Sequence, residues 1–197
     1  DDDMSATPVN GYVGNPSVVN AYTNDTLNGV PVVLAEITGG ILTPATPLTP
    51  GANVPVMDPS TGIVSVPAQT PAGTYTITYQ ICEVLNPTNC DTVTTSVTVT
   101  APVIDAVTET TPSINGNTGG STGPLTANDT LNGSPVTVGT APGDVTITVG
   151  TVQGGLTMDP LTGVVTVPVN TPAGSYNVTY TICEVNNPTN CDTVTSV

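Results

Sequence analysis

The chain has 197 residues, of which 15 are acidic and none is Lys, Arg or His, so its formal net charge is −15. Without cationic side chains it cannot neutralise phosphates, which excludes nucleic acids and anionic membrane surfaces as electrostatic partners. The usual general bases, Schiff-base amines and imidazole metal ligands are missing too, so only carboxylate chemistry remains.

The composition favours β-structure. Thr and Val are abundant, and the chain has 20 Gly and 20 Pro, residues that typically form turns between strands. Few aromatics and a high net charge would also suit a disordered chain, but regular apolar alternation argues against disorder. No stretch is apolar over the length of a membrane span, and no basic segment precedes an apolar one. We therefore expect neither a membrane helix nor a signal peptide.

Internal repeats divide the chain into two copies of one unit. We predict two domains, residues 1–101 and residues 102–197, that join near Ala101-Pro102. The second copy ends without counterparts of Thr98 to Thr100. The recurring segments are Asn-Asp-Thr-Leu-Asn-Gly (24–29 and 128–133), Met-Asp-Pro (57–59 and 158–160), Thr-Pro-Ala-Gly (70–73 and 171–174) and Ile-Cys-Glu-Val (81–84 and 182–185).

Within each copy the apolar period is two, which is typical of half-buried strands. Asn28-Gly29 and Asn132-Gly133 predict type I′ hairpin turns, and Asp58 to Gly62 predicts a turn between strands. Short strands separated by turns, with no helical pattern, predict an all-β chain of two tandem immunoglobulin-like β-sandwich domains. In chain order, the strands expected in the first copy are 17–23, 30–37, 54–57, 62–66, 75–81 and 90–99.

Four cysteines form two equally spaced pairs, Cys82/Cys90 and Cys183/Cys191, each around a Pro-containing turn. Such a turn allows the two Cys to face each other across neighbouring strands, close enough for a disulfide. We predict a disulfide in each pair, with free thiols as the alternative, and therefore an oxidising, extracellular setting. Each disulfide would tie one hairpin and would not bridge two sheets.

Carboxylates gather at the start of each copy, as Asp1, Asp2 and Asp3 in the first and as Asp105 in the second, with Glu109 close by. Hard oxygen ligands of this kind could hold Ca²⁺ where successive domains meet. The alternative is a solvated terminus. Asn24-Asp25-Thr26 and its repeat read as turns closed by Asx-type hydrogen bonds.

In order along the chain, these motifs resemble tandem bacterial Ig-like repeats related to the cadherin-like repeats of very large surface adhesins. The resemblance rests on the Asp-rich start, Asn-Asp-Thr-Leu-Asn-Gly, Met-Asp-Pro-x-Thr-Gly-x-Val, Thr-Pro-Ala-Gly-x-Tyr and the Cys-Glu to Cys-Asp-Thr hairpin. Such adhesins are found notably in Bacteroidota, which export them by the type IX secretion system. The resemblance implies an extended extracellular array, and its Asp-rich start is similar to calcium-binding linkers.

Exported proteins of that phylum carry O-glycans at Asp-Ser/Thr followed by an aliphatic residue, and chance matches are the alternative in so Thr-rich a chain. Glycans would solubilise and protect the surface. The matching threonines are Thr26, Thr92, Thr130 and Thr193.

Three classes of function remain. The first is a structural and adhesive repeat of a bacterial surface stalk, adhesin or filament, whose partners are further copies, neighbouring repeats or surface glycans. A filament could form by strand exchange between protomers. The second is a carbohydrate-binding module, which needs exposed aromatics and has only Tyr12 and Tyr22 to offer. The third is an enzyme with paired acids among Glu36, Glu83 and Asp91, which we do not expect because Glu83 and Asp91 recur as a structural turn.

Overall fold

The computed structural model describes residues 3–4 and 7–197, and within them the chain forms strands and turns with no helix. None of the described residues therefore belongs to a helix that could cross a membrane. Two compact units are formed, the first ending at Ala101 and the second beginning at Pro102.

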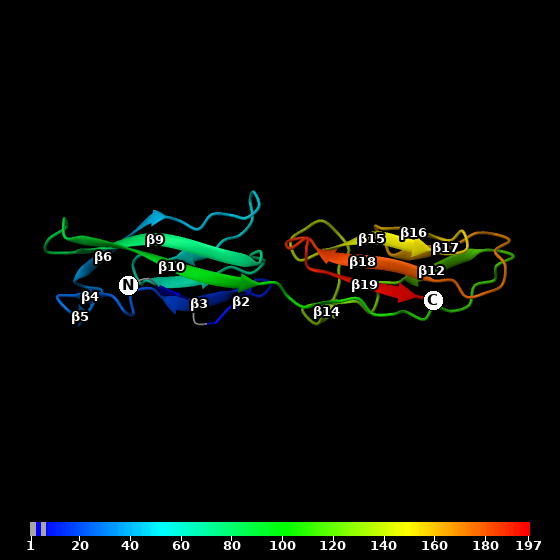
Figure 1. Cartoon of the computed structure of the whole chain (residues 1–197), viewed down its shortest axis with the longest axis horizontal. Helices are drawn as coiled ribbons and strands as arrows, with labels where there is room; N and C mark the ends of the chain where they lie inside the picture. Colours follow the sequence, from blue (N-terminus) through cyan, green and yellow to red (C-terminus); the bar gives the residue numbers. More distant parts are fainter. Residues whose placement is uncertain (1–2, 5–6) are drawn as a thin grey trace. The chain divides into compact units, whose positions relative to one another are not determined.

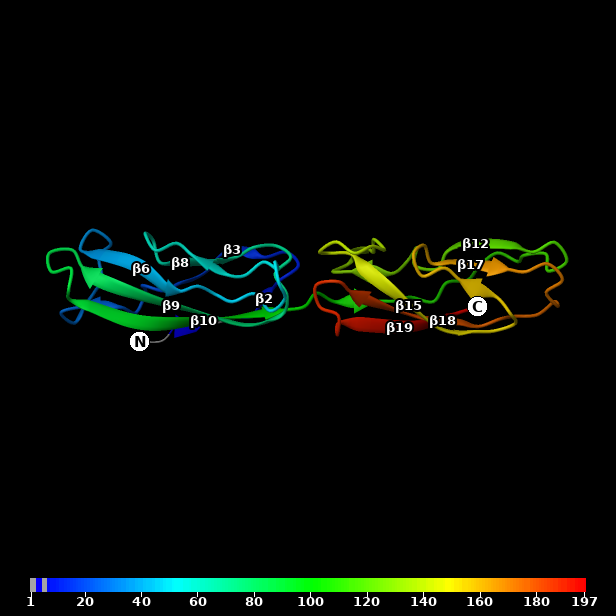
Figure 2. The same cartoon turned by 90° about the horizontal axis from the view of Figure 1, so that it is seen from above.

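Unit 1 is a sandwich of two sheets. One sheet has the strand order β1-β10-β9-β6, with β2 also paired to β10, and the other has the order β3-β8-β7. Figure 2 shows the two layers, with β9 and β10 in one and β3 and β8 in the other. The strands are β1 (Asp3–Met4), β2 (Val9–Asn10), β3 (Asn15–Asn20), β4 (Thr26–Leu27), β5 (Val30–Pro31), β6 (Ile37–Thr43), β7 (Val56–Met57), β8 (Ile63–Val66), β9 (Gly73–Glu83) and β10 (Cys90–Thr100).

Unit 2 repeats this arrangement with the sheets β15-β18-β19 and β12-β17-β16, and a small third sheet, β11-β13-β14. Figure 1 shows the long hairpin of β18 and β19 in unit 2, the counterpart of β9 and β10 in unit 1. The strands are β11 (Ile104–Asp105), β12 (Gly120–Pro124), β13 (Thr130–Leu131), β14 (Ser134–Pro135), β15 (Val145–Val152), β16 (Thr157–Met158), β17 (Val164–Val167), β18 (Val178–Glu184) and β19 (Cys191–Ser196).

The strand order is that of the immunoglobulin fold. In unit 1 the second, fifth and fourth sandwich strands (β3, β8, β7) form one sheet, and the third, sixth and seventh (β6, β9, β10) form the other. A tyrosine corner, the hydrogen bond from a tyrosine near the start of the sixth strand to a carbonyl just upstream, is a further mark of this fold. The Tyr75 hydroxyl donates to the Pro71 carbonyl at 2.8 Å, and the Tyr176 hydroxyl donates to the Pro172 carbonyl at 2.6 Å. The predicted fold class, an all-β chain of two tandem immunoglobulin-like sandwiches, is confirmed.

The core of unit 1 follows from the period of two. Along β9 the side chains of Tyr75, Ile77, Tyr79 and Ile81 are buried, whereas the Thr residues between them face outward. Val64 and Val66 of β8 come from the opposite sheet into the same apolar cluster. Burial of these large side chains supplies the main driving force for folding of the unit.

One predicted strand, 30–37, is wrong. Val30 and Pro31 form only the second arm of a tight hairpin with β4, and the long strand of this region is β6, Ile37–Thr43. Its Gly39-Gly40 pair hides β6 in the sequence, because Gly usually weakens a strand. At Gly39 the glycine is required, since a Cβ there would collide with the Tyr22 hydroxyl and the Pro59 carbonyl.

Candidate functional site

Each unit buries one aspartate against one tyrosine, and these pairs are its most unusual polar feature. In unit 2 the Tyr180 hydroxyl lies 2.7 Å from the Leu125 carbonyl and 3.0 Å from Asp129 Oδ2, and neither Tyr180 nor Asp129 has any exposed area. In unit 1 the Tyr79 hydroxyl lies 2.7 Å from the Ala21 carbonyl and 3.1 Å from Asp25 Oδ2. The predicted Asx-turn role of Asp25 and its repeat is therefore incomplete, because both carboxyls bind a core tyrosine.

A tyrosine hydroxyl carries one hydrogen, so it cannot donate to a carbonyl and to a carboxylate at once. In both units the carbonyl is the nearer acceptor. If the carboxyl is protonated, it donates to the hydroxyl oxygen, and both contacts then become hydrogen bonds. Burial raises the pKa of Asp129, and the negative charges of Glu109 and Asp105 raise it further. Hydrogen bonds with the Val107 N–H and Tyr180 lower it, but burial has the larger effect. Burial likewise raises the pKa of Asp25.

These shifts predict that mild acid stabilises the protein. A carboxyl whose pKa is higher in the folded state contributes stability that is fully present below the unfolded pKa and lost as the pH rises through the folded pKa. N–H and hydroxyl groups of the turns donate hydrogen bonds to Asp58 and Asp159 and lower the pKa of both carboxyls. The stability that these two carboxylates contribute is lost only at lower pH, as the pH falls through their folded pKa values. We expect the melting temperature to rise as the pH falls from 7.5 toward the ordinary Asp pKa of about 4.

Calorimetry over this pH range checks the prediction. The Asp25→Asn and Asp129→Asn variants, which cannot titrate, should each flatten the profile. A melting temperature that falls steadily from pH 7.5 to pH 5 in the unmodified chain would contradict a raised carboxyl pKa.

Both expected disulfides are present. Cys82 is joined to Cys90 and Cys183 to Cys191, and each bond links directly opposite residues of a hairpin, β9 with β10 and β18 with β19. The cross-link therefore lies within one sheet at the closed end of the hairpin, as the spacing predicts. All four cysteines are used in this way.

In unit 1 the first and last strands run side by side in the same direction. There β1 pairs with β10 in parallel, and β2 continues the parallel pairing where Val9 and Asn10 lie beside Val99 and Thr100. In unit 2, residues 106–109 lie beside β19, and two of their backbone N–H groups donate to side chains of that strand. The Ala106 N–H donates to Asp192 Oδ2 at 2.9 Å, and the Glu109 N–H donates to Ser196 Oγ at 2.9 Å.

The predicted calcium ligands are placed only in part. Asp1 and Asp2 lie outside the described residues, Asp3 lies on β1 in unit 1, and Asp105 lies exposed on β11 in unit 2. Across residues 3–4 and 7–197, no three His, Cys, Asp or Glu side chains come together as a metal site. The calcium ligand set stays a prediction.

The four candidate glycosylation threonines differ in their surroundings. Thr26, Thr92 and Thr193 are exposed, whereas Thr130 is half-buried. The aspartates that precede Thr26 and Thr130 are the buried Asp25 and Asp129, which the sequence did not reveal. Asp91-Thr92 on β10 is therefore exposed at both residues, whereas on β19 Thr193 is exposed beside a half-buried Asp192.

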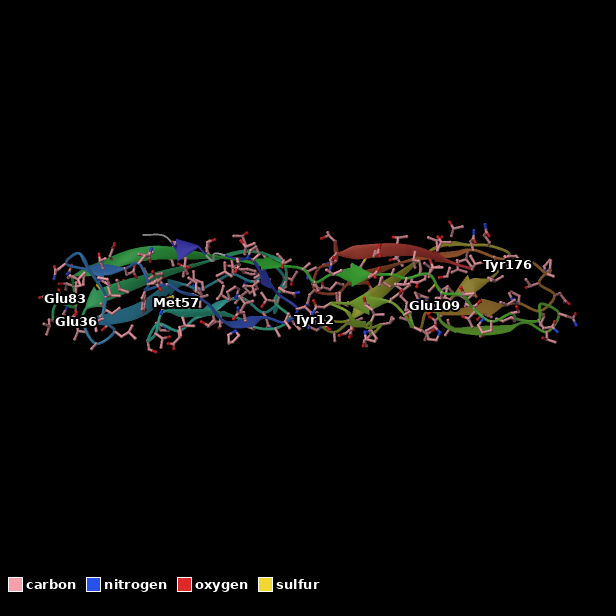
Figure 3. The ribbon with its side chains drawn as sticks, turned by 90° about the horizontal axis from the view of Figure 1, so that it is seen from below. Tyr12, Glu36, Met57, Glu83, Glu109 and Tyr176 are labelled. Atoms are coloured by element: carbon pink, nitrogen blue, oxygen red, sulfur yellow. A yellow bond between two sulfur atoms is a disulfide. The ribbon has the colours of Figure 1, made fainter. Side chains whose placement is uncertain are left out.

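Two of the side chains considered for sugar binding and for catalysis, Tyr22 and Glu83, have surroundings that do not suit these tasks, and Tyr12 is half-buried. Tyr22 is buried against Tyr79, with ring centroids 5.7 Å apart, and it donates to the Pro59 carbonyl, so it forms no sugar platform. Glu36 and Glu83 lie at the same end of unit 1 (Figure 3). The side chains of Asn86 and Asn89 lower the pKa of Glu83, whereas a catalytic acid needs a raised one.

Comparisons with known proteins identify similar folds at low identity. No family model and no curated protein matches the chain. Among solved structures it is similar to the protocadherin GammaB4 extracellular domain (12% identity, TM-score 0.33). The match covers 99% of this chain and 32% of the protocadherin chain. It is also similar to the human desmocollin-1 ectodomain (13% identity, TM-score 0.37), where the match covers 99% of this chain and 40% of desmocollin-1. A third similar structure is human CDH23 EC21-23 (16% identity, TM-score 0.38), where the match covers 99% of this chain and 70% of the CDH23 chain. The chain thus spans less than half of the first two proteins, and its fold assignment rests on its own strand order and tyrosine corners.

Proposed function

We propose that this chain is a load-bearing and adhesive repeat of an extracellular array, a stalk, adhesin or filament on a bacterial surface. The observation that carries the proposal is the parallel pairing of the first and last strands of unit 1. A pull on the two ends of such a unit draws these strands past each other. Their hydrogen bonds are then loaded together in shear and cannot open one after another.

Three further features support this role. The disulfides fit an oxidising environment outside the cell, and they keep the hairpins closed under load. The charge of −15 with no cation makes neighbouring fibres repel one another. Each unit also has its own buried side chains, such as Tyr79 in unit 1 and Tyr180 in unit 2. Separate cores are expected of repeats that fold one by one.

Finer parts of the proposal come from the resemblance of the sequence motifs. They are export by the type IX system of a Bacteroidota-type bacterium, Ca²⁺ at the Asp-rich start of a repeat, and O-glycans, for which the exposed Thr92 and Thr193 are the better placed sites. The partners would be further copies, neighbouring repeats or surface glycans. We propose no enzymatic activity.

The load-bearing role predicts that unit 2 weakens when residues 106–109 lose their acceptors on β19. In the Asp192→Ala/Ser196→Ala chain, the Ala106 and Glu109 N–H groups lose their partners, at a cost of about 2 kcal/mol in total. Single-molecule stretching of the chain should then show one of its two unfolding events at a lower force. The matched control is Asp91→Ala, since the Asp91 carboxylate accepts from the neighbouring Thr92 N–H. Equal forces in the double variant and the unmodified chain would contradict the shear role.

The extracellular location is tested independently. An antibody raised against the 197-residue chain should label intact cells of the producing organism without permeabilisation. Labelling that appears only after lysis would overturn the proposed location while leaving the mechanical result intact.

A further inference from the structure

Unit 1 has a long connection between β6 and β7 that unit 2 does not repeat. In unit 1 this connection spans residues 44–55, whereas the equivalent connection between β15 and β16 spans residues 153–156, which contain neither Thr nor Pro. Together with Thr43, the last residue of β6, the long connection begins with three consecutive Thr-Pro-x triplets. We call these triplets, residues 43–51, the Thr-Pro segment.

The prolines make the Thr-Pro segment extended. A proline ring fixes its own φ near the value of polyproline II, and it disfavours the helical conformation in the residue before it. Each Thr-Pro pair is therefore biased toward an extended backbone with three residues per turn. A turn ends the segment, because the Ala52 N–H donates to the Thr49 carbonyl at 3.1 Å and Gly51 has a φ of 80°. Pro50 and Gly51 occupy the central positions that these residues favour in a type II turn.

The third residue of each of the first two triplets attaches the segment to unit 1. Ala45 is 5% exposed and belongs to the core cluster. Leu48 covers Gly73 so closely that a Cβ at this glycine would collide with the Leu48 side chain. Beyond the turn, the Asn53 side-chain amide donates to the Ala68 carbonyl at 2.8 Å. The Thr and Pro residues of all three triplets are exposed, so the segment is fixed to the unit while its hydroxyls face solvent.

The hydroxyls of the segment differ from those of the Thr-Pro-Ala-Gly motif that both copies share. The Thr70 hydroxyl donates to the Pro67 carbonyl, and the Thr171 hydroxyl donates to the Pro168 carbonyl, each at 2.7 Å. These two threonines therefore have a structural role in their turns. The three threonine hydroxyls of the Thr-Pro segment have no hydrogen-bond partner among the described residues, so a modifying enzyme can reach them without breaking a bond.

We propose that the Thr-Pro segment is an acceptor site for O-linked glycosylation at Thr43, Thr46 and Thr49. Segments rich in Thr and Pro are typical of O-glycosylated stalks. The donor is a sugar activated as a phosphate ester. The threonine Oγ bonds to the anomeric carbon as the bond from that carbon to the phosphate oxygen breaks. The phosphate leaves with the bonding electrons, and the hydroxyl proton passes to a base of the transferase. The inference goes beyond the proposed function, because it uses neither the strand pairing nor the Asp-Thr motif.

The test is mass spectrometry of the protein purified from the producing organism. After reduction and unfolding, cleavage after Glu and before Asp releases residues 37–57 as one fragment, whose only hydroxyl side chains are Thr38 and the three segment threonines. We expect this fragment to carry at least one glycan, located on a segment threonine. The matched fragment 144–158 of unit 2, which has four threonines and no Pro, should keep its unmodified mass. An unmodified 37–57 fragment, glycans on Thr38 alone, or equal modification of both fragments would overturn the inference.

Matched variants test which hydroxyls accept the sugar. The chain is made in a host without protein glycosylation and incubated with a membrane extract of the producing organism, which supplies the transferase and its sugar donors. The unmodified chain should gain glycan mass on fragment 37–57, and Thr43→Val/Thr46→Val/Thr49→Val should lose all of it. The control Thr148→Val/Thr151→Val/Thr157→Val changes three exposed threonines of unit 2 and should keep the full gain. Valine has the shape of threonine without the hydroxyl, and an unchanged melting temperature verifies the fold of both variants. An equal gain in the segment variant and the unmodified chain would overturn the inference.

Discussion

Replacement of Tyr180 by Phe is expected to destabilise unit 2 by about 2 to 3 kcal/mol, because two buried polar groups lose the hydroxyl that links them. Those groups are the Leu125 carbonyl and the Asp129 carboxyl, both inside a core that excludes water. The ring of Phe keeps the packing of the tyrosine, so the effect isolates the hydroxyl. Differential scanning calorimetry should show one of the two units melting about 10 °C lower, since 1 kcal/mol shifts a domain of this size by about 4 to 8 °C.

Tyr176→Phe is the matched control in the same unit. The Tyr176 hydroxyl also donates to one carbonyl, that of Pro172, but this bond is exposed to solvent and water can replace it. We expect a loss below about 1 kcal/mol. If the two variants melt at the same temperature, the buried Asp129–Tyr180 pair does not have the structural importance assigned to it.

Removal of the unit 2 disulfide by Cys183→Ser/Cys191→Ser is expected to cost about 2 to 3 kcal/mol, the loop-entropy value for so short a loop. The backbone ladder between β18 and β19 is unaffected, so the fold should survive. Chemical denaturation of the variant, compared with the unmodified chain, measures the loss. The equivalent Cys82→Ser/Cys90→Ser variant should lower the stability of unit 1 alone.

Reduction provides an independent control for the disulfide prediction. The four-serine chain combines both double variants and has no disulfide. Dithiothreitol should lower the stability of the unmodified chain to that of the four-serine chain. It should leave the stability of the four-serine chain unchanged. A four-serine chain as stable as the oxidised protein would contradict any structural contribution of these bonds.

Local patterns predicted much of the fold. Asn28-Gly29 and Asn132-Gly133 adopt the positive φ angles of a type I′ turn, and the period of two from Tyr75 to Ile81 describes β9 correctly. The Cys spacing was sufficient to predict both disulfides, because two such residues close a single hairpin. These features depend on neighbours in the chain, which is why sequence alone reveals them.

The remaining features depend on contacts between distant residues. Asp25 and Tyr79 are far apart in the chain, and only the fold brings the carboxyl to the hydroxyl. The identical Asn-Asp-Thr-Leu-Asn-Gly segments of the two copies were the available clue, since a turn alone does not require Asp. β6 was missed for a similar reason, because the need for Gly39 comes from Tyr22 and Pro59.

The central claim, that unit 1 resists force through its parallel first and last strands and unit 2 through the hydrogen bonds of residues 106–109 to β19, is tested most directly by stretching the single chain from its two ends. The account predicts two separate unfolding events, each releasing the length of one unit at about 3.4 Å per residue, less the residues enclosed by its disulfide. Dithiothreitol should add that enclosed length to each event without removing the force peak. A chain that extends gradually, with no discrete force peak for either unit, would contradict the claim.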